Sequence, residues 1–188
     1  DIPEKVATAS EMIFLEGYLF DKDQGKEAFR QASRMTRTAG GRAGIAISDP
    51  FCVNRHRNDF IEMIKNDLDF VIGNEHEIKS LYETNDLEAA MSKTADMIKL
   101  MVCTRSGDGV TIMSNGERHD IPVNKITPVD ATGAGDQFAA GFIYGMVTGR
   151  DLETCGKMGN LCAAEVISHI GPRPATDMRR EFARARLE

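Results

Sequence analysis

A short run of small residues, 130–136 (DATGAGD), places a carboxylate beside backbone N–H groups at the predicted start of an apolar helix. Small side chains leave the N–H groups of Gly133, Ala134 and Gly135 uncovered, and the helix dipole adds about half a positive charge there. An anion site of this kind beside the carboxylate of Asp136 suits the transfer of a phosphoryl group to a hydroxyl. The alternative is that the glycines form only a tight turn and that Asp136 only caps the helix.

A second polar pair, Asn74 and Glu77, follows a predicted buried strand and opens a predicted helix. Residues three apart lie on one helix face, so both side chains can point into the crevice at the carboxyl end of that strand. In isolation, the same pattern is typical of an asparagine cap with acids in the first helical turn.

A third candidate is the polar, glycine-containing turn at residues 104–110 (TRSGDGV), which follows another predicted strand. Taken alone, this segment is an ordinary turn that needs no ligand. Asn160 lies in the middle of a predicted helix, where asparagine is a poor helix former, and this favours a binding role for its side chain.

The elements that must position these residues alternate between strand and helix, which predicts an α/β fold with a mostly parallel sheet sandwiched by helices. Asn115-Gly116 is a strong hairpin signal between the last two strands. The predicted strands are 12–20, with a turn at Gly17, then 44–48, 69–72, 100–104, 109–114 and 117–123. The predicted helices are 26–38, 57–65, 75–82, 87–98, 137–148, 152–170 and 177–187.

Composition excludes several function classes. The formal net charge of −6 argues against nucleic acid as a partner, because phosphate backbones require a basic face. No apolar run approaches the ~20 residues that span a bilayer, so no membrane partner is expected. The four cysteines form no CxxC pair and are typical of reduced thiols, which indicates a cytoplasmic protein.

The run DATGAGDQFAAGFIYG closely resembles the carboxyl-terminal motif of the ribokinase-like (PfkB) carbohydrate and nucleoside kinases. This resemblance implies a ribokinase-like fold and ATP-dependent phosphoryl transfer to a sugar or nucleoside. It also implies that Asp136 is the catalytic base and that the amides of Gly133, Ala134 and Gly135 hold the transition-state oxygens.

Two further motifs extend the resemblance. Asn74 and Glu77 match the family's Asn-x-x-Glu motif, which helps to organise Mg²⁺, its waters and the phosphates, so Glu77 is expected to act on Mg²⁺ through water. Thr104, Ser106 and Gly109 match the family's Thr-x-Gly-x-x-Gly loop beside the nucleotide. Ser106 departs from this pattern at the first glycine position.

Two weaker correspondences rest on the resemblance alone. Asn160 aligns with a residue near adenine. Some family members bind a monovalent cation near the anion hole, and the matching positions here are Asp130 and Thr132, with carbonyls near Val166 and Gly171. Carbonyl and carboxylate oxygens of this kind suit K⁺.

The resemblance covers about residues 12–174 and corresponds to the carboxyl-terminal, nucleotide-binding part of the family. The first strands, a small β lid and most of the acceptor pocket have no counterpart in the sequence, which begins at Asp1. We therefore expect residues 1–188 to form one α/β domain of a larger kinase. By itself, this domain is expected to transfer phosphate poorly. An open sheet edge would also leave homo-oligomerisation as an alternative.

The acceptor is less well determined than the reaction. The segments IGNEHEIKSLY and IGPRP, together with the glycine motif, look most like bacterial members described as adenosine kinase or sugar kinase, which makes adenosine the best single guess. A rival interpretation is a kinase-derived module that binds nucleotide without catalysis. A dinucleotide-binding oxidoreductase is disfavoured, because Gly40, Gly41 and Gly44 do not form a GxGxxG pattern.

Overall fold

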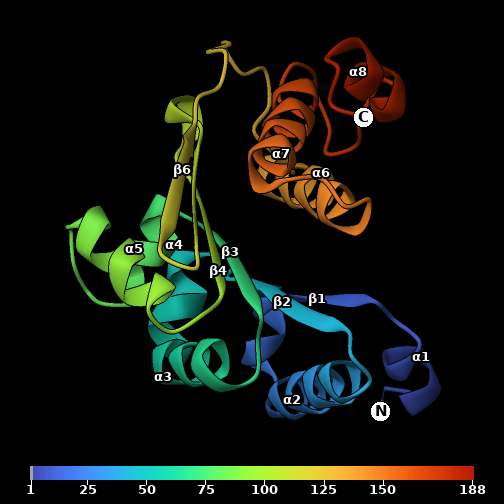
Figure 1. Ribbon diagram of the computed structural model, residues 1–188. Coiled ribbons are helices and arrows are strands. Elements are labelled where there is room, and N and C mark those ends of the chain that lie inside the picture. The colour runs from blue at the N-terminus through green and yellow to red at the C-terminus, as the bar shows by residue number, and fades with distance from the viewer. Residues whose placement is uncertain (1) are drawn as a thin grey trace. The chain divides into compact units, whose positions relative to one another are not determined.

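The computed structural model describes residues 2–188 and contains a six-stranded mixed sheet flanked by helices (Figure 1). The strand order is β1-β2-β3-β4-β5-β6, and the pairs β1–β2 and β2–β3 are parallel. This confirms the predicted α/β class. The strands are β1 (Met12–Glu16), β2 (Arg42–Ala46), β3 (Phe70–Asn74), β4 (Leu100–Thr104), β5 (Val110–Ser114) and β6 (Glu117–Ile121).

The helices connect these strands and continue after the hairpin. They are α1 (Glu4–Thr8), α2 (Asp23–Thr38), α3 (Pro50–Asn66), α4 (Glu75–Ser80), α5 (Leu87–Ala95), α6 (Ala134–Val147), α7 (Leu152–Val166) and α8 (Met178–Arg184), with short 3₁₀ turns η1 (Gly17–Asp21) and η2 (Ser106–Asp108). The chain divides into two compact units. The first contains the described residues up to Cys103 together with Met113–Glu117, and the second contains Thr104–Ile112 and Arg118–Glu188.

In the first unit, α2 packs next to β1 and β2, and α3 lies across from the polar face of α2 (Figure 1). Their facing polar edges are joined by ion pairs, including one of 2.8 Å between Lys26 and Asp59. The apolar core of this unit lies between the helices and the strands, and Ile45, Phe60 and Val71 are fully buried in it. The strands are therefore held in fixed register, which fixes the positions of the residues at their carboxyl ends.

Several predicted boundaries were wrong. Strand β1 ends at Glu16 and Gly17–Asp21 form η1, so the predicted strand 12–20 continues too far. Helix α3 begins at Pro50 and not at residue 57, because Asp49 caps it by accepting a hydrogen bond from the Cys52 N–H at 2.8 Å and proline suits a first helical position. Helix α7 ends at Val166, so His169 does not lie on a helix as the sequence predicted. The Ile167 carbonyl accepts the Val129 N–H at 2.8 Å, and this tertiary contact ends the helix.

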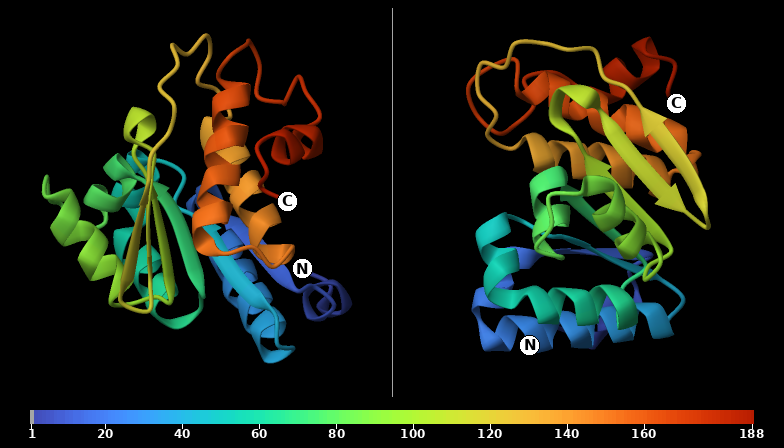
Figure 2. Two further views of the ribbon diagram at one scale, coloured as in Figure 1. Left: turned by 45° about the horizontal axis from the view of Figure 1, so that its top comes forward. Right: turned by 90° about the vertical axis from the view of Figure 1, so that its left-hand side faces the viewer.

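In the second unit, α6 and α7 pack against each other (Figure 2). Glycines at their interface allow the two backbones to approach closely. A Cβ atom on Gly141 would lie 2.6 Å from the carbonyl oxygen of Met158 and 2.7 Å from the Sγ of Cys162. Because one of these neighbours is backbone, the contact cannot be relieved by a side-chain rotation.

Replacing Gly141 with Ala should therefore lower the free energy of unfolding by about 1–3 kcal/mol, the usual cost of overpacking a core. A matched control is Gly135→Ala in the first turn of the same helix, where an added Cβ would meet nothing within 4 Å. That variant should be neutral or up to about 1 kcal/mol more stable, because alanine is the better helix former. Urea unfolding measures both changes, and equal stability of the two variants would contradict the packing argument.

The four cysteines, Cys52, Cys103, Cys155 and Cys162, are all free and buried. Burial raises the pKa of the Cys52 and Cys162 thiols to about 11. No helix among residues 2–188 combines the length and the apolar character needed to cross a membrane.

Candidate functional site

The start of α6 is shaped by Gly133, the N-cap residue, which adopts a left-handed conformation with φ +80°. A Cβ atom there would lie 2.7 Å from the Cβ of Pro172, so both the backbone angle and the space require glycine. Gln137 fastens the same loop, since its side chain donates to the Pro172 carbonyl at 3.2 Å and its N–H donates to the Gly133 carbonyl at 2.9 Å. The loop that precedes the helix is thereby held against residue 172.

The first turn of α6 presents unused hydrogen-bond donors. The Ala134 N–H donates to the Ala131 carbonyl at 3.2 Å, so it closes a turn within the protein. Within residues 2–188, no partner is found for the N–H groups of Gly133, Gly135 and Asp136. Such donors at a helix start favour an anion. The carboxylate of Asp136 is exposed, and no ion pair or hydrogen bond to it is found in the described part of the chain.

Asp130 organises the loop before this helix. Its Oδ1 accepts hydrogen bonds from the N–H and the hydroxyl of Thr132 at 2.9 and 2.7 Å, and its Oδ2 accepts from the Gly171 N–H at 3.1 Å. The bond from the Thr132 hydroxyl is the main cause that lowers the pKa of the Asp130 carboxyl below its ordinary value. The residues predicted for a monovalent cation thus lie together, around a carboxylate that remains charged.

Asn74 and Glu77 form a reciprocal cap at the start of α4. The Asn74 side-chain oxygen accepts hydrogen bonds from the N–H groups of His76 and Glu77 at 2.9 and 3.0 Å. In return, the Glu77 carboxylate accepts from the Asn74 N–H at 2.9 Å and from the Asn74 amide at 2.5 Å. Asn74 therefore caps α4, as the alternative interpretation of the sequence proposed. The same hydrogen bonds fix the orientation of the Glu77 carboxylate.

Glu77 is only 6% exposed, and burial raises the pKa of its carboxyl from 4.5 to about 7. The charges of Asp49 and Glu16 raise it further, whereas the hydrogen bond from Asn74 lowers it. Glu16 and Asp49 lie near enough to act on the charge of Glu77 because β1, β2 and β3 are aligned, with Glu16 opposite Ala46 and Ala46 opposite Ile72.

Glu16 and Asp49 were not singled out from the sequence. The available signal was that each lies at or just after the carboxyl end of a strand, where ligands bind in parallel sheets. A ready-made cluster of three metal-binding side chains is not found among residues 2–188. The Glu77 carboxylate, with both oxygens already accepting hydrogen bonds, therefore fits an indirect role towards a cation better than direct coordination.

Two of the residues predicted to contact the nucleotide, Gly109 and Asn160, meet beside the end of β6. A Cβ atom on Gly109 would lie 2.0 Å from the Ile121 carbonyl oxygen, and the side-chain amide of Asn160 donates to the carbonyls of Ile121 and Pro122 at 3.5 and 3.4 Å. Ser106 has φ +48°, a left-handed conformation that glycine adopts more easily than serine. Thr104, the last residue of β4, leads into this turn.

The predicted site residues are divided between the two units. Asn74 and Glu77 belong to the first unit, at the carboxyl ends of its parallel strands. All the other predicted site residues belong to the second unit, where Gly109 and Asn160 gather around residues 121–122 and the remaining acids and glycines gather around the start of α6.

The model of the pfkB family of carbohydrate kinases matches residues 2–178. An uncharacterized sugar kinase of Archaeoglobus fulgidus is 35% identical over 121 residues, which cover 63% of this chain and 47% of that relative. The chain thus spans about half the length of the curated relative.

Two solved structures are closely similar. The structure of a probable sugar kinase from Rhizobium etli CFN 42 has a TM-score of 0.97 and 38% identity, and the match covers 100% of this chain and 58% of that one. The structure of adenosine kinase from Sinorhizobium meliloti has a TM-score of 0.95 and 38% identity, with coverage of 98% and 57%. These matches confirm the resemblance inferred from the glycine motif. The chain belongs to the pfkB family of carbohydrate kinases.

Proposed function

We propose that this chain carries the nucleotide-binding and catalytic part of a kinase that transfers the terminal phosphate of ATP to a hydroxyl of a sugar or nucleoside. The observation that carries the proposal is the first turn of α6, where three N–H groups without a partner in residues 2–188 adjoin the exposed carboxylate of Asp136. Donors and a base in one helical turn match the two requirements of this reaction, which are charge stabilisation and positioning of the attacking hydroxyl.

In the proposed reaction, the acceptor hydroxyl gives its proton to a carboxylate oxygen of Asp136 as the hydroxyl oxygen attacks the terminal phosphorus. The bond from phosphorus to the bridging oxygen breaks, and the nucleoside diphosphate leaves with that electron pair. The N–H groups of Gly133 and Gly135 donate hydrogen bonds to the phosphoryl oxygens, on which negative charge is spread in the transition state. Gly109 and Asn160, beside residues 121–122, are proposed to border the nucleotide.

Cations complete the proposal. Glu77 suits Mg²⁺ held through water. A nearby divalent cation would offset the repulsion between the Glu77 carboxylate and the negative charges of Glu16 and Asp49. When bound, Mg²⁺ neutralises phosphate charge. Asp130 and Thr132 supply the oxygens that a K⁺ ion would need beside the anion site.

The experiment that tests the proposal is phosphate transfer by the full-length protein that carries this sequence. ATP and Mg²⁺ are supplied with adenosine first, because a similar solved structure is an adenosine kinase, and then with a panel of sugars and other nucleosides. Turnover on one acceptor supports the proposal and names the substrate. ATP binding without turnover on any acceptor would overturn it in favour of a non-catalytic nucleotide-binding module.

A further inference from the structure

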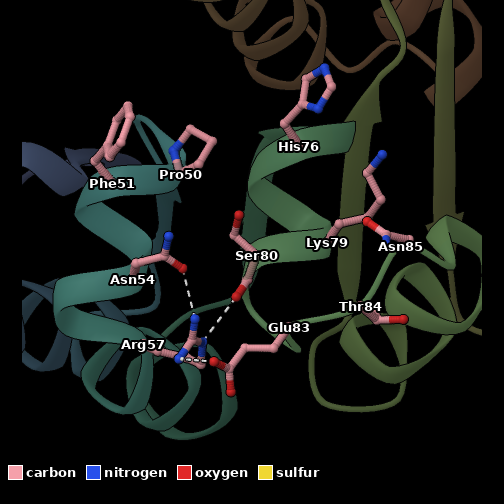
Figure 3. A pocket seen from close by; sticks show the side chains of 10 residues that line it. All are labelled: Pro50, Phe51, Asn54, Arg57, His76, Lys79, Ser80, Glu83, Thr84 and Asn85. Atoms are coloured by element: carbon pink, nitrogen blue, oxygen red, sulfur yellow. Dashed lines mark hydrogen bonds and ion pairs between the residues drawn. The ribbon is translucent and has the colours of Figure 1, made fainter.

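A pocket of about 670 Å³ lies in the first unit, and neither Asn74 nor Glu77 is among the residues that line it (Figure 3). Its size is within the range of small-molecule sites. Three segments line it: the beginning of α3, one face of α4 and the turn before α5. The lining residues that carry the argument are Phe51, Asn54, Arg57, His76, Lys79 and Ser80.

Arg57 fixes one end of the pocket. Its guanidinium donates to the Ser80 carbonyl at 2.9 Å and to the Asn54 side-chain oxygen at 2.7 Å, and it forms an ion pair of 3.3 Å with Glu83 (Figure 3). Three acceptors from three segments thus hold the planar fork of this arginine. Bidentate recognition of a ligand carboxylate, for which a free arginine fork is best suited, is thereby disfavoured.

Among the described residues that line the pocket, Lys79 on α4 is a cation without a carboxylate partner. Within residues 2–188, no carboxylate lies within ion-pair distance of Lys79, and the nearest acid to the His76 ring is Glu75 at 3.9 Å. His76 and Lys79 are three residues apart and lie on one face of the helix. They therefore offer adjacent point-like donors, which suit the tetrahedral, doubly charged phosphate group.

We propose that this pocket binds a small organic phosphate, a monoester whose phosphate pairs with Lys79 and His76. The polar body of the ligand lies over Ser80 and reaches the Asn54 amide, whose nitrogen has no partner in the described residues. Phe51, with 76% of its surface exposed, forms an apolar rim. The site requires no turnover, so it stands or falls independently of the proposed kinase reaction.

The test uses NMR signals of the His76 ring, assigned with a His76→Gln variant, as a local reporter of binding. Adenosine 5′-monophosphate is titrated into the protein, with adenosine and inorganic phosphate as separate arms. We expect a saturable shift with the monophosphate, weaker binding of inorganic phosphate and no shift with adenosine. Lys79→Glu should weaken monophosphate binding about 10- to 100-fold, the loss of a charge-assisted hydrogen bond.

Lys65→Glu is the matched control, because it makes the same charge change on the exposed last turn of α3, outside the pocket. It should leave the affinity measured at His76 unchanged. Absence of a saturable His76 shift at millimolar monophosphate would overturn the proposal. An equal affinity in the Lys79→Glu and Lys65→Glu variants would also overturn it, because the ligand would then bind elsewhere.

Discussion

Replacing Asp136 with Asn should lower the rate of phosphoryl transfer by about 10²- to 10⁴-fold, the usual contribution of a general base. Asparagine has nearly the same shape but cannot accept the proton of the acceptor hydroxyl. The N–H groups of Gly133 and Gly135 are unchanged by the substitution, so ATP affinity should survive. The measurement is kcat of the full-length protein under saturating ATP and acceptor, together with ATP binding by calorimetry.

The matched control is Asp151→Asn at the start of α7. Asp151 is also a carboxylate at a helix start, where it accepts a hydrogen bond from the Thr154 N–H at 2.7 Å. Asparagine caps a helix about as well as aspartate, so this variant should keep both stability and rate. Equal rates in the two variants would exclude Asp136 as the base. Its role would then be only that of an acidic residue in the first turn of a helix.

The second large effect concerns the pH dependence of stability at Glu77. The pKa of this carboxyl is raised from 4.5 to about 7 in the folded state, mainly by burial. Between these two pH values the folded protein keeps a proton that the unfolded chain has lost, so stability falls as pH rises through this window. The shift corresponds to a loss of about 3 kcal/mol in the free energy of unfolding. This loss is absent below pH 4.5 and complete above pH 7.

Replacing Glu77 with Gln should remove this decline, because glutamine stays neutral at every pH. The free energy of unfolding, measured in urea across the window, should then differ between variant and wild type by an amount that grows with pH. Glu75→Gln, in the same turn of α4 but outside the cap, is the control and should keep the wild-type slope. A wild-type slope in the Glu77→Gln variant would assign the pH dependence to other groups.

Local chemistry predicted several elements well. The Asn115-Gly116 turn has φ of +52° and +82°, which is what the tight turn between β5 and β6 requires. The strand 100–104 was placed correctly, because it is a continuous apolar run with a clear boundary. The helix after the glycine motif was also predicted, but it begins at Ala134 and not at residue 137. The segment Asp49-Pro50 was less informative, because it was interpreted only as the end of a strand. In the structure β2 already ends at Ala46, and Asp49-Pro50 begins α3.

What the sequence could not predict depends on contacts between distant segments. The end of α7 is set by the loop at Val129 and Asp130, about 40 residues earlier in the chain. The environment of Glu77 depends on the alignment of three strands that brings Glu16 and Asp49 near it. A local pattern identifies Glu77 as a candidate, but its burial and its neighbours arise only from the packed sheet.

The buried cysteines have a practical consequence for labelling. Alkylating reagents and maleimide dyes react with the thiolate, and burial keeps the Cys52 and Cys162 thiols protonated at neutral pH, with the pKa of each at about 11. A single cysteine introduced on the surface would therefore react far faster than these two. Spectroscopic labels can thus be attached at chosen positions, such as the rim of the α3–α4 pocket, while the native cysteines stay in place.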